Sequence, residues 1–251
     1  MNHSLARMLS LLGLTVLLLT VGGCLGSRDW HYPPESSGAY IGAKAAKPIP
    51  ARVVVLPFED LRGNTVKDEY WKAAIPFILF GELEYDRPEE VKDPEEVDEV
   101  KFDPPKDFAK ATTKELQESG VFSSVEYAGD GKAPPSDLVV HGTIRSTNWE
   151  RRLYTYLLGP LGTVFWVVGV PMGQHTTTVE LDLRLTPASN PSVAVWEMSM
   201  EFKGKKWDSP YYNLEEAVQT YPFALQEALR PAILDLVALA EEDPDRLYAP
   251  K

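Results

Sequence analysis

The sequence predicts an α/β fold: a mixed β-sheet of about four to five strands with helices packed on it, preceded by a cleaved signal peptide and a flexible tether. Three patterns carry this prediction. A continuous aliphatic run at 53–58 is typical of a strand covered on both faces. Alternating apolar residues at 179–185 and 194–202 indicate half-buried strands. Apolar residues recur at helical spacing through 213–242, and helices together with strands favour a layered α/β domain.

The first residues carry the pattern of an export signal. Positive charge on Arg7 and on the terminal amine precedes a mostly apolar run over 8–21. This run is shorter than the roughly 20 residues that a helix needs to cross a bilayer. It ends in an aliphatic residue, two small residues and the one cysteine of the chain: Val21, Gly22, Gly23 and Cys24.

This ending resembles the lipobox of bacterial lipoproteins. The resemblance implies cleavage before Cys24, so that 1–23 is a signal peptide, and attachment of a diacylglyceryl group to the Cys24 thiol. Because Leu25 rather than aspartate follows, it also implies delivery to the outer membrane, facing the periplasm. We therefore expect a cell-envelope protein held to the membrane by covalent lipid. The alternative is an ordinary secretory signal with an incidental cysteine.

The mature chain divides into three parts. Prolines, glycines and serines throughout 24–51 predict a flexible tether after the lipidated cysteine. A single α/β periplasmic domain is expected over 52–242, and a C-terminal tail over 243–251. Within the domain, insertions are expected at about 59–104, much of it an acidic solvated loop, and at about 153–175.

The middle of the domain contains one helix and two strand candidates. Pro105 stands at a first-turn position, and the helical pattern ends before Gly120. Strand patterns follow at 121–127 and 138–149.

The last part of the domain predicts a hairpin and a long helix. In the hairpin, Trp196 and Met198 should be buried, whereas Glu197 and Ser199 should face water. Asn213 is the expected N-cap of the final helix. Two prolines, Pro222 and Pro231, should kink this helix or split it.

Four segments resemble, in their order, a group of lipoprotein domains: Val53 to Asp60, the helix end Glu118-Ser119-Gly120, Phe122 to Tyr127, and Asp137 to Ile144. The group includes the TolB amino-terminal domain, the curli secretion lipoprotein and the lipoprotein activator of penicillin-binding proteins. The resemblance spans about 52–242 as an order of elements. It implies a non-enzymatic domain that works by contact with an envelope protein partner.

Composition and motifs favour a protein without catalysis. A net charge of −12 repels phosphate backbones, so nucleic acid is not an expected partner. The domain has two histidines, His141 and His175, and lacks a Gly-x-Ser-x-Gly or His-Glu-x-x-His motif. Asp137 is about 13 Å from His141 if both lie on one strand, too far to pair. We expect no catalytic residue, metal or cofactor, although a carboxylate pair for sugar hydrolysis needs no local motif.

The segment with the most unusual composition lies between Arg152 and Glu180, where 27 residues include no Asp, Glu, Lys or Arg. Phe165, Trp166, Val167 and Val168 form its most apolar part. Glycines and prolines disfavour a membrane-spanning helix here. The favoured interpretation is burial in the domain as a strand or hairpin, where the apolar 75–83 segment could meet it. The alternative is docking to a membrane or a partner.

The leading hypothesis is therefore an outer-membrane-anchored lipoprotein that acts as a non-catalytic interaction or assembly module. A second hypothesis is an oligomeric transport or secretion component that inserts apolar loops into the membrane. A periplasmic hydrolase is the third.

Overall fold

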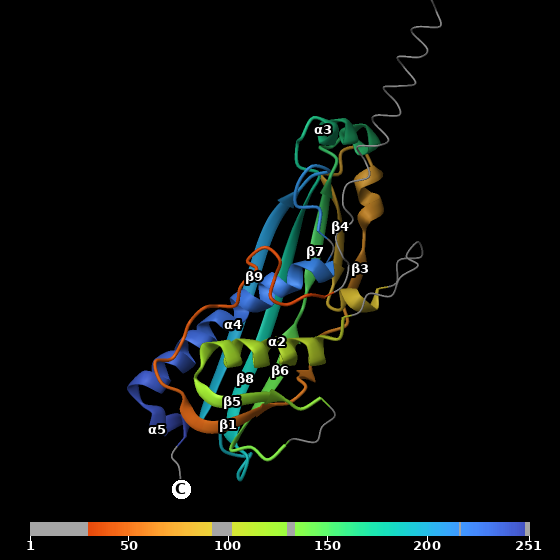
Figure 1. The fold of residues 1–251 in the computed structure, drawn as a ribbon. Coiled ribbons are helices and arrows are strands. Elements are labelled where there is room, and N and C mark those ends of the chain that lie inside the picture. Colours follow the sequence, from red (N-terminus) through yellow and green to blue (C-terminus); the bar gives the residue numbers. More distant parts are fainter. Residues whose placement is uncertain (1–29, 92–101, 130–133, 216, 249–251) are drawn as a thin grey trace, which may run out of the picture.

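The computed structural model describes residues 30–91, 102–129, 134–215 and 217–248 (Figure 1). A mixed sheet of nine strands runs in the order β3-β4-β7-β8-β6-β1-β5, with β9 on β8 and β2 on β6. Its strands are β1 (Ile49–Val55), β2 (Glu59–Asp60), β3 (Val66–Asp68), β4 (Phe80–Tyr85), β5 (Phe122–Tyr127), β6 (Leu138–Ser146), β7 (Trp149–Tyr154), β8 (Gly173–Pro187) and β9 (Trp196–Asp208). The α/β class is confirmed.

The predicted count of four to five strands is wrong. Five strands, β1, β5, β6, β8 and β9, correspond to the predicted ones, and the structure adds β2, β3, β4 and β7. Two of the additions, β3 and β4, are short and carry charged residues within the stretch expected to be an insertion, so they lack the alternation that marks a strand. An acidic loop was expected from residue 82 onward, but its first residues, 82–85, belong to strand β4. Part of that loop, 92–101, lies outside the described residues.

The parallel part of the sheet is built around β1. This strand lies between β5 and β6 and pairs in parallel with both. Val53, Val54 and Val55 are all buried, as the continuous aliphatic run predicts for a strand covered on both faces.

The hairpin of β8 and β9 confirms the predicted strand phase. Leu185 faces Trp196 and Leu183 faces Met198 across the two strands. Trp196 is 6% exposed, Met198 is partly buried against the core, and the intervening Glu197 is exposed. Ser199 is also exposed, as expected.

Two helices, α2 (Pro104–Ser119) and α4 (Ala217–Glu242), cover one face of this sheet (Figure 1). The predicted helix α2 is confirmed: the Asp103 side chain caps its start, and Gly120 ends it with a φ of 61°. The predicted split of the last helix is wrong, because α4 continues through Pro222 and Pro231. Asn213 is not its N-cap, since it lies outside the helix at a φ of 53°.

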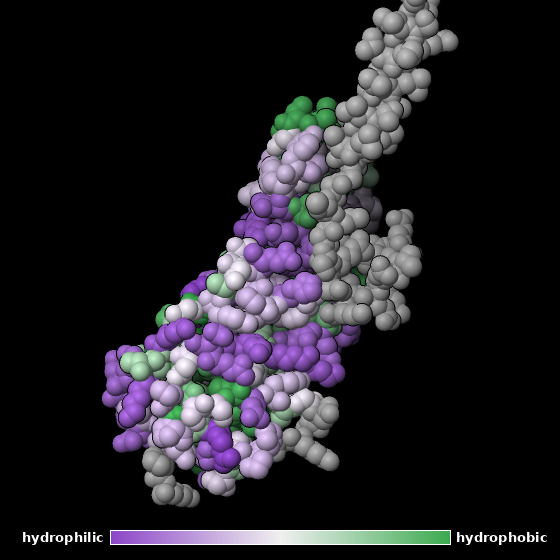
Figure 2. Space-filling model, viewed as in Figure 1, coloured by the Kyte–Doolittle hydropathy of each residue, from purple (hydrophilic) through white to green (hydrophobic). Residues whose placement is uncertain are grey.

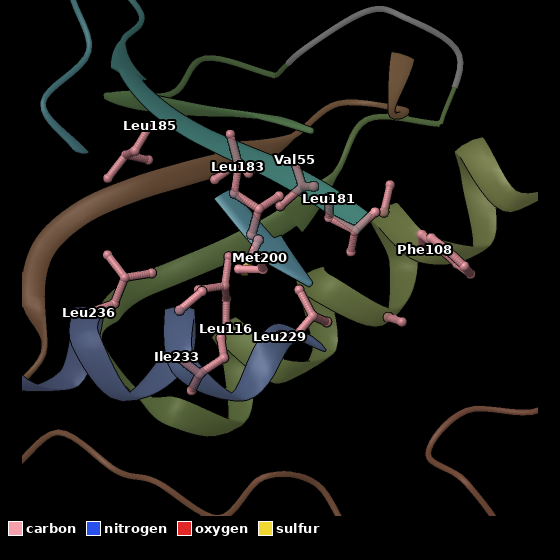
Figure 3. Close-up of a cluster of buried hydrophobic side chains, with 14 of the residues drawn as sticks. Val55, Phe108, Leu116, Leu181, Leu183, Leu185, Met200, Leu229, Ile233 and Leu236 are labelled. Carbon is pink, nitrogen blue, oxygen red and sulfur yellow. The ribbon is translucent and has the colours of Figure 1, made fainter. Parts of the chain in front are cut away.

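The core fills the space between these helices and the sheet. Figure 3 shows side chains of both layers pointing toward one another. The labelled members are Val55, Phe108, Leu116, Leu181, Leu183, Leu185, Met200, Leu229, Ile233 and Leu236. Because many apolar residues of α4 are buried, their packing offsets the backbone hydrogen bonds that its prolines cannot donate.

The described part of the predicted tether is packed against the domain, which corrects the prediction of flexibility there. The ring of Trp30 stacks on Phe102 at 4.9 Å and lies 5.6 Å from Phe108. Ile41 also packs against the core, and β1 begins at Ile49, before the expected domain boundary. Apolar and aromatic residues scattered among prolines have no periodicity, so sequence alone does not distinguish them from a solvated linker.

The C-terminal stretch is likewise partly structured. A short helix, α5 (Pro244–Leu247), forms within the expected tail, and Leu247 is buried in the core.

Candidate docking surface

One end of the molecule is formed by the connection between β7 and β8. This connection contains a 3-10 helix, η3 (Gly159–Gly162), and a short helix, α3 (Thr163–Val167), which lie at the top of Figure 1. The opposite end holds the turn between β8 and β9. The long hairpin therefore separates these two ends of the domain.

Apolar side chains at the α3 end are exposed to solvent. Leu161 is 73% exposed, Val167 is 70% exposed and Val168 is 73% exposed. Figure 2 shows hydrophobic residues gathered at this end of the molecule. The favoured expectation of burial is therefore wrong for this surface, because the strands extend past the helices and nothing among the described residues covers it.

The four residues singled out from the sequence divide into two pairs. Phe165 is 39% exposed and packs edge-on against Tyr156 at 5.3 Å. The indole Nε1 of Trp166 donates a 2.9 Å hydrogen bond to the carbonyl of Tyr154. These two side chains hold α3 on the domain, whereas Val167 and Val168 face outward.

A second segment joins this surface, as the sequence suggested for 75–83. The backbone N–H of Phe77 donates a 2.8 Å hydrogen bond to the carbonyl of Leu157. Phe77 is 87% exposed. We define the apolar tip as the exposed apolar residues of these two segments: Ile75, Phe77, Ile78, Leu79, Leu157, Leu158, Leu161, Val164, Phe165, Val167 and Val168.

The backbone of the tip adopts conformations that few side chains favour. Tyr156 has a φ of 55° and Leu157 a φ of 67°, and Phe77 on the facing segment has a φ of 69°. Non-glycine residues at positive φ are uncommon and cluster at functional sites. Gly162 is required here, because a Cβ would lie 1.9 Å from the carbonyl oxygen of Thr155.

Paired charges begin directly below the tip. Across β4 and β7, the guanidinium Nε of Arg152 lies 3.0 Å from a carboxylate oxygen of Glu82. Lys67 also pairs with Glu82, and this hydrogen bond holds the pKa of the carboxyl below its usual range. Arg152 pairs further with Glu150 at 2.6 Å. The surface thus changes from apolar to charged within a few residues.

Exposed aromatic residues lie at the same level. Trp71 is 62% exposed and Tyr211 is 65% exposed. The Tyr211 hydroxyl donates a 2.8 Å hydrogen bond to the carbonyl of Val167, and the ring of Trp207 lies 5.5 Å from that of Tyr154. The rings of Tyr211 and Trp207 therefore lie at the base of the tip.

The sequence identified only part of this surface. The absence of charged residues between Arg152 and Glu180 pointed to this surface, and that uncharged stretch includes Leu161. The apolar 75–83 segment was also suggested as a partner of this stretch, but only the fold shows that its Phe77 lies beside Leu157 and is exposed.

The residues considered for catalysis do not assemble into a site. The Nε2 of His141 lies 3.2 Å from the Thr186 hydroxyl, and burial lowers the pKa of this imidazole. Asp137 instead accepts hydrogen bonds from Arg52. Among the residues that the structure describes, no group of three His, Cys, Asp or Glu could hold a metal ion.

The lipobox residues Val21, Gly22 and Gly23 and the lipidation candidate Cys24 lie outside the described residues. No helix in the described ranges has the length and apolar character needed to cross a membrane.

Neither a protein-family model nor a curated protein sequence matches this chain. Among solved structures, the DUF330 protein XCC0632 from Xanthomonas campestris is 13% identical, with a TM-score of 0.39, over 81% of this chain and 94% of that one. Dodecameric PelC from Paraburkholderia phytofirmans, in two crystal forms, is 12% identical with a TM-score of 0.34. Those matches cover 75% and 76% of this chain and 92% of each PelC chain. At these TM-scores, we draw no conclusion about this chain from the similarity.

Proposed function

We propose that this protein is a lipid-anchored, non-catalytic module of the cell envelope that presses its apolar tip into the membrane surface holding its lipid. The exposed tip carries the proposal. An apolar surface of this extent is unusual on a monomer and marks a contact with another apolar phase. Of the two expected partners, membrane and protein, the arrangement of side chains around the tip favours the membrane.

The chemistry of the surface changes sharply below the tip. The tip segments, 75–79 and 155–172, contain no charged residue. Next to them come exposed tryptophan and tyrosine rings, at Trp71, Trp207 and Tyr211, together with charged pairs such as Arg152–Glu82. Trp207 and Arg152 lie at one level, because both are paired with Gln174. Membrane proteins likewise place apolar residues in the hydrocarbon and aromatic rings at the interface with water.

The position of the chain start is consistent with this orientation. Five residues separate Cys24 from Trp30, and an extended stretch of that length spans about 20 Å. His31 and Lys206 line one surface hollow, and Lys206 is near the end of β9 that leads to the tip. Lipid on Cys24 would therefore hold the tip half of the domain, rather than the β8–β9 turn, toward the bilayer.

The tip would orient the domain more than it would strengthen the attachment. Each buried methylene contributes about 0.8 kcal/mol, so several acyl chains already make release slow. Burial of outward valine and leucine side chains adds about 1.5–3 kcal/mol each, which suffices to fix one orientation among many.

A fluorescent label on the tip tests the proposal. We would place an environment-sensitive dye on Val168→Cys in the lipidated full chain, whose own cysteine is occupied by lipid, and reconstitute it in liposomes. Quenchers attached to the lipid acyl chains should quench this dye. The matched control is Val193→Cys, which replaces a valine 53% exposed in the β8–β9 turn and should not be quenched.

Equal quenching at both positions, or none at Val168→Cys, would overturn membrane docking. Absence of quenching combined with a concentration-dependent dye response would instead indicate that the tip binds protein or a second copy of the chain. Mass spectrometry of the mature terminus tests the anchor separately, since Cys24→Ala should abolish lipid attachment and leave the precursor unprocessed.

A further inference from the structure

A row of three basic side chains crosses the sheet near the tip. Arg151 on β7 faces His175 on β8, which in turn faces Lys206 on β9. Directly paired residues of neighbouring strands project from the same face, with Cβ atoms about 4.5–5.5 Å apart. Because Lys206 and His175 line a cavity with residues of α4, this is the helix-covered face.

The imidazole at the centre of this row has no hydrogen bond among the described residues. His175 is 2% exposed, and neither ring nitrogen has a hydrogen-bond partner. Its Nδ1 lies 3.5 Å from a carboxylate oxygen of Asp208, which is 1% exposed. Arg151 also approaches that oxygen, at 3.4 Å, and so offsets the charge of Asp208. Buried polar atoms in folded proteins nearly always find partners, so this imidazole indicates a missing one.

A cavity of about 270 Å³ opens beside His175, between the β8–β9 hairpin and the first half of α4. Apolar groups form most of one side, where the rings of Phe202 and Phe223 meet edge-on at 5.7 Å. Gly204 allows the Phe202 ring to lie over the strand, because a Cβ there would lie 2.7 Å from that ring. This volume is slightly below the range of about 300–1,000 Å³ for small-molecule sites, so only a compact ligand would fit.

The polar side of the cavity has more donors than acceptors to spare. Glu227 is paired with Arg230, and the Thr177 hydroxyl donates at 2.8 Å to that of Thr220. The ammonium of Lys206 contacts both oxygens of Glu215, at 3.0 and 3.1 Å.

An ammonium has three N–H donors, and an imidazole keeps at least one N–H in either protonation state. His175 and Lys206 can therefore each donate to a further acceptor inside the cavity.

We propose that this cavity binds a small monocarboxylic acid with a compact apolar body. Its carboxylate would accept hydrogen bonds from His175 and Lys206, while its body would lie against Phe202 and Phe223. A carboxylate fits because its oxygens accept without donating, and charge-assisted hydrogen bonds of this kind are the strong ones. The proposal is independent of membrane docking, because the cavity lies on the helix-covered side of the sheet, behind the tip.

Histidine NMR on the full-length chain gives a direct test with benzoate as the probe. The chain has four histidines, so ¹⁵N-histidine labelling yields few imidazole signals, and a His175→Gln sample identifies those of His175. Benzoate up to about 10 mM should shift the His175 signals in a saturable way. The His141 signals should not move, because His141 contacts Thr186 rather than the cavity. Benzyl alcohol should bind about 10-fold or more weakly, since it lacks the charged acceptor.

Two lysine variants separate the cavity from general ionic attraction. Lys206→Met should weaken benzoate binding about 10-fold or more. The matched control, Lys203→Met, removes an exposed lysine from the same strand and should leave the affinity unchanged. Equal affinities of the two variants, equal binding of benzyl alcohol, or unshifted His175 signals would each overturn the proposal. Val167→Ser with Val168→Ser should not change benzoate binding, and a loss there would place the ligand on the tip instead.

Discussion

The buried carboxylate of Glu115, on α2, accepts a 2.5 Å hydrogen bond from the hydroxyl of Tyr32. The same carboxylate accepts from the backbone N–H of Ile41 at 3.0 Å and from the amide of Gln226, on α4, at 3.3 Å. One carboxylate thus ties the N-terminal segment, 30–48, to both helices. Since the lipid is expected only a few residues earlier, this contact also determines where the anchor leaves the domain.

Tyr32→Phe should lower the free energy of unfolding by about 1–3 kcal/mol, because it removes one partner of a buried charged group. Urea unfolding measures this loss. Trypsin should also cut faster at Lys44 in the variant, since the segment is released from α2. Tyr40→Phe removes a hydroxyl from the same segment without touching Glu115 and should have neither effect. Similar values for the two variants would argue against the role of this carboxylate.

Stability should decline in alkali. Burial, together with Glu115, raises the pKa of Tyr32, and complete burial raises that of Tyr221. Both tyrosines keep their protons in the folded state above the ordinary pKa of 10.0, where the unfolded state releases them. The stabilisation that these two tyrosines give the folded state is therefore full below about pH 10 and is lost as the pH rises further.

Urea unfolding at several pH values, with tyrosinate absorbance, measures this dependence. In Tyr32→Phe, the free energy of unfolding should decline less steeply above pH 10, because the variant lacks one of the two tyrosines whose pKa is raised. An identical slope in wild type and variant would contradict the assignment to Tyr32.

The hairpin provides a test of the core. Trp196 packs inward and its Nε1 donates a 2.7 Å hydrogen bond to Asp235 on α4. Trp196→Ala should cost about 3–5 kcal/mol. The neighbouring Glu197→Ala should change stability by no more than about 0.5 kcal/mol, because this side chain faces water. Chemical denaturation of the two variants gives the comparison, and equal losses would mean that the strand phase is wrong.

The two pairs within 165–168 should behave differently. Phe165→Ser with Trp166→Ser removes the contacts with Tyr156 and Tyr154, and should destabilise the tip by about 1–3 kcal/mol. Val167→Ser with Val168→Ser should leave stability within about 0.5 kcal/mol, and it should improve solubility. Hydrogen exchange of the 155–172 amides measures local opening that a melting temperature can miss. Equal protection of these amides from exchange in both double variants would contradict the division into an inward pair and an outward pair.

Secondary structure with strong local periodicity was predictable. The helix α2, the buried strand β1 and the phase of the β8–β9 hairpin all follow from residue patterns at their own positions. The strands β3 and β4 were missed because they carry charged side chains, and because β4, on which β3 pairs, is itself paired with β7, a partner distant in the sequence. The candidate site was half predictable: 165–168 was identified, but its outward and inward residues were not distinguished.

Sequence alone determined the order of the main strands and helices, and the uncharged stretch that became the tip. The sequence also contains the lipobox-like motif from which the lipid anchor at Cys24 is predicted. Only the tertiary structure decided that Phe77 lies beside Leu157, that Tyr32 reaches Glu115, and that His175 lies between Arg151 and Lys206. Periodicity records which face of an element is apolar, since each residue's position in a helix or strand fixes its direction. Which distant elements meet, and whether an apolar face is covered or left open, depends on packing across the whole chain.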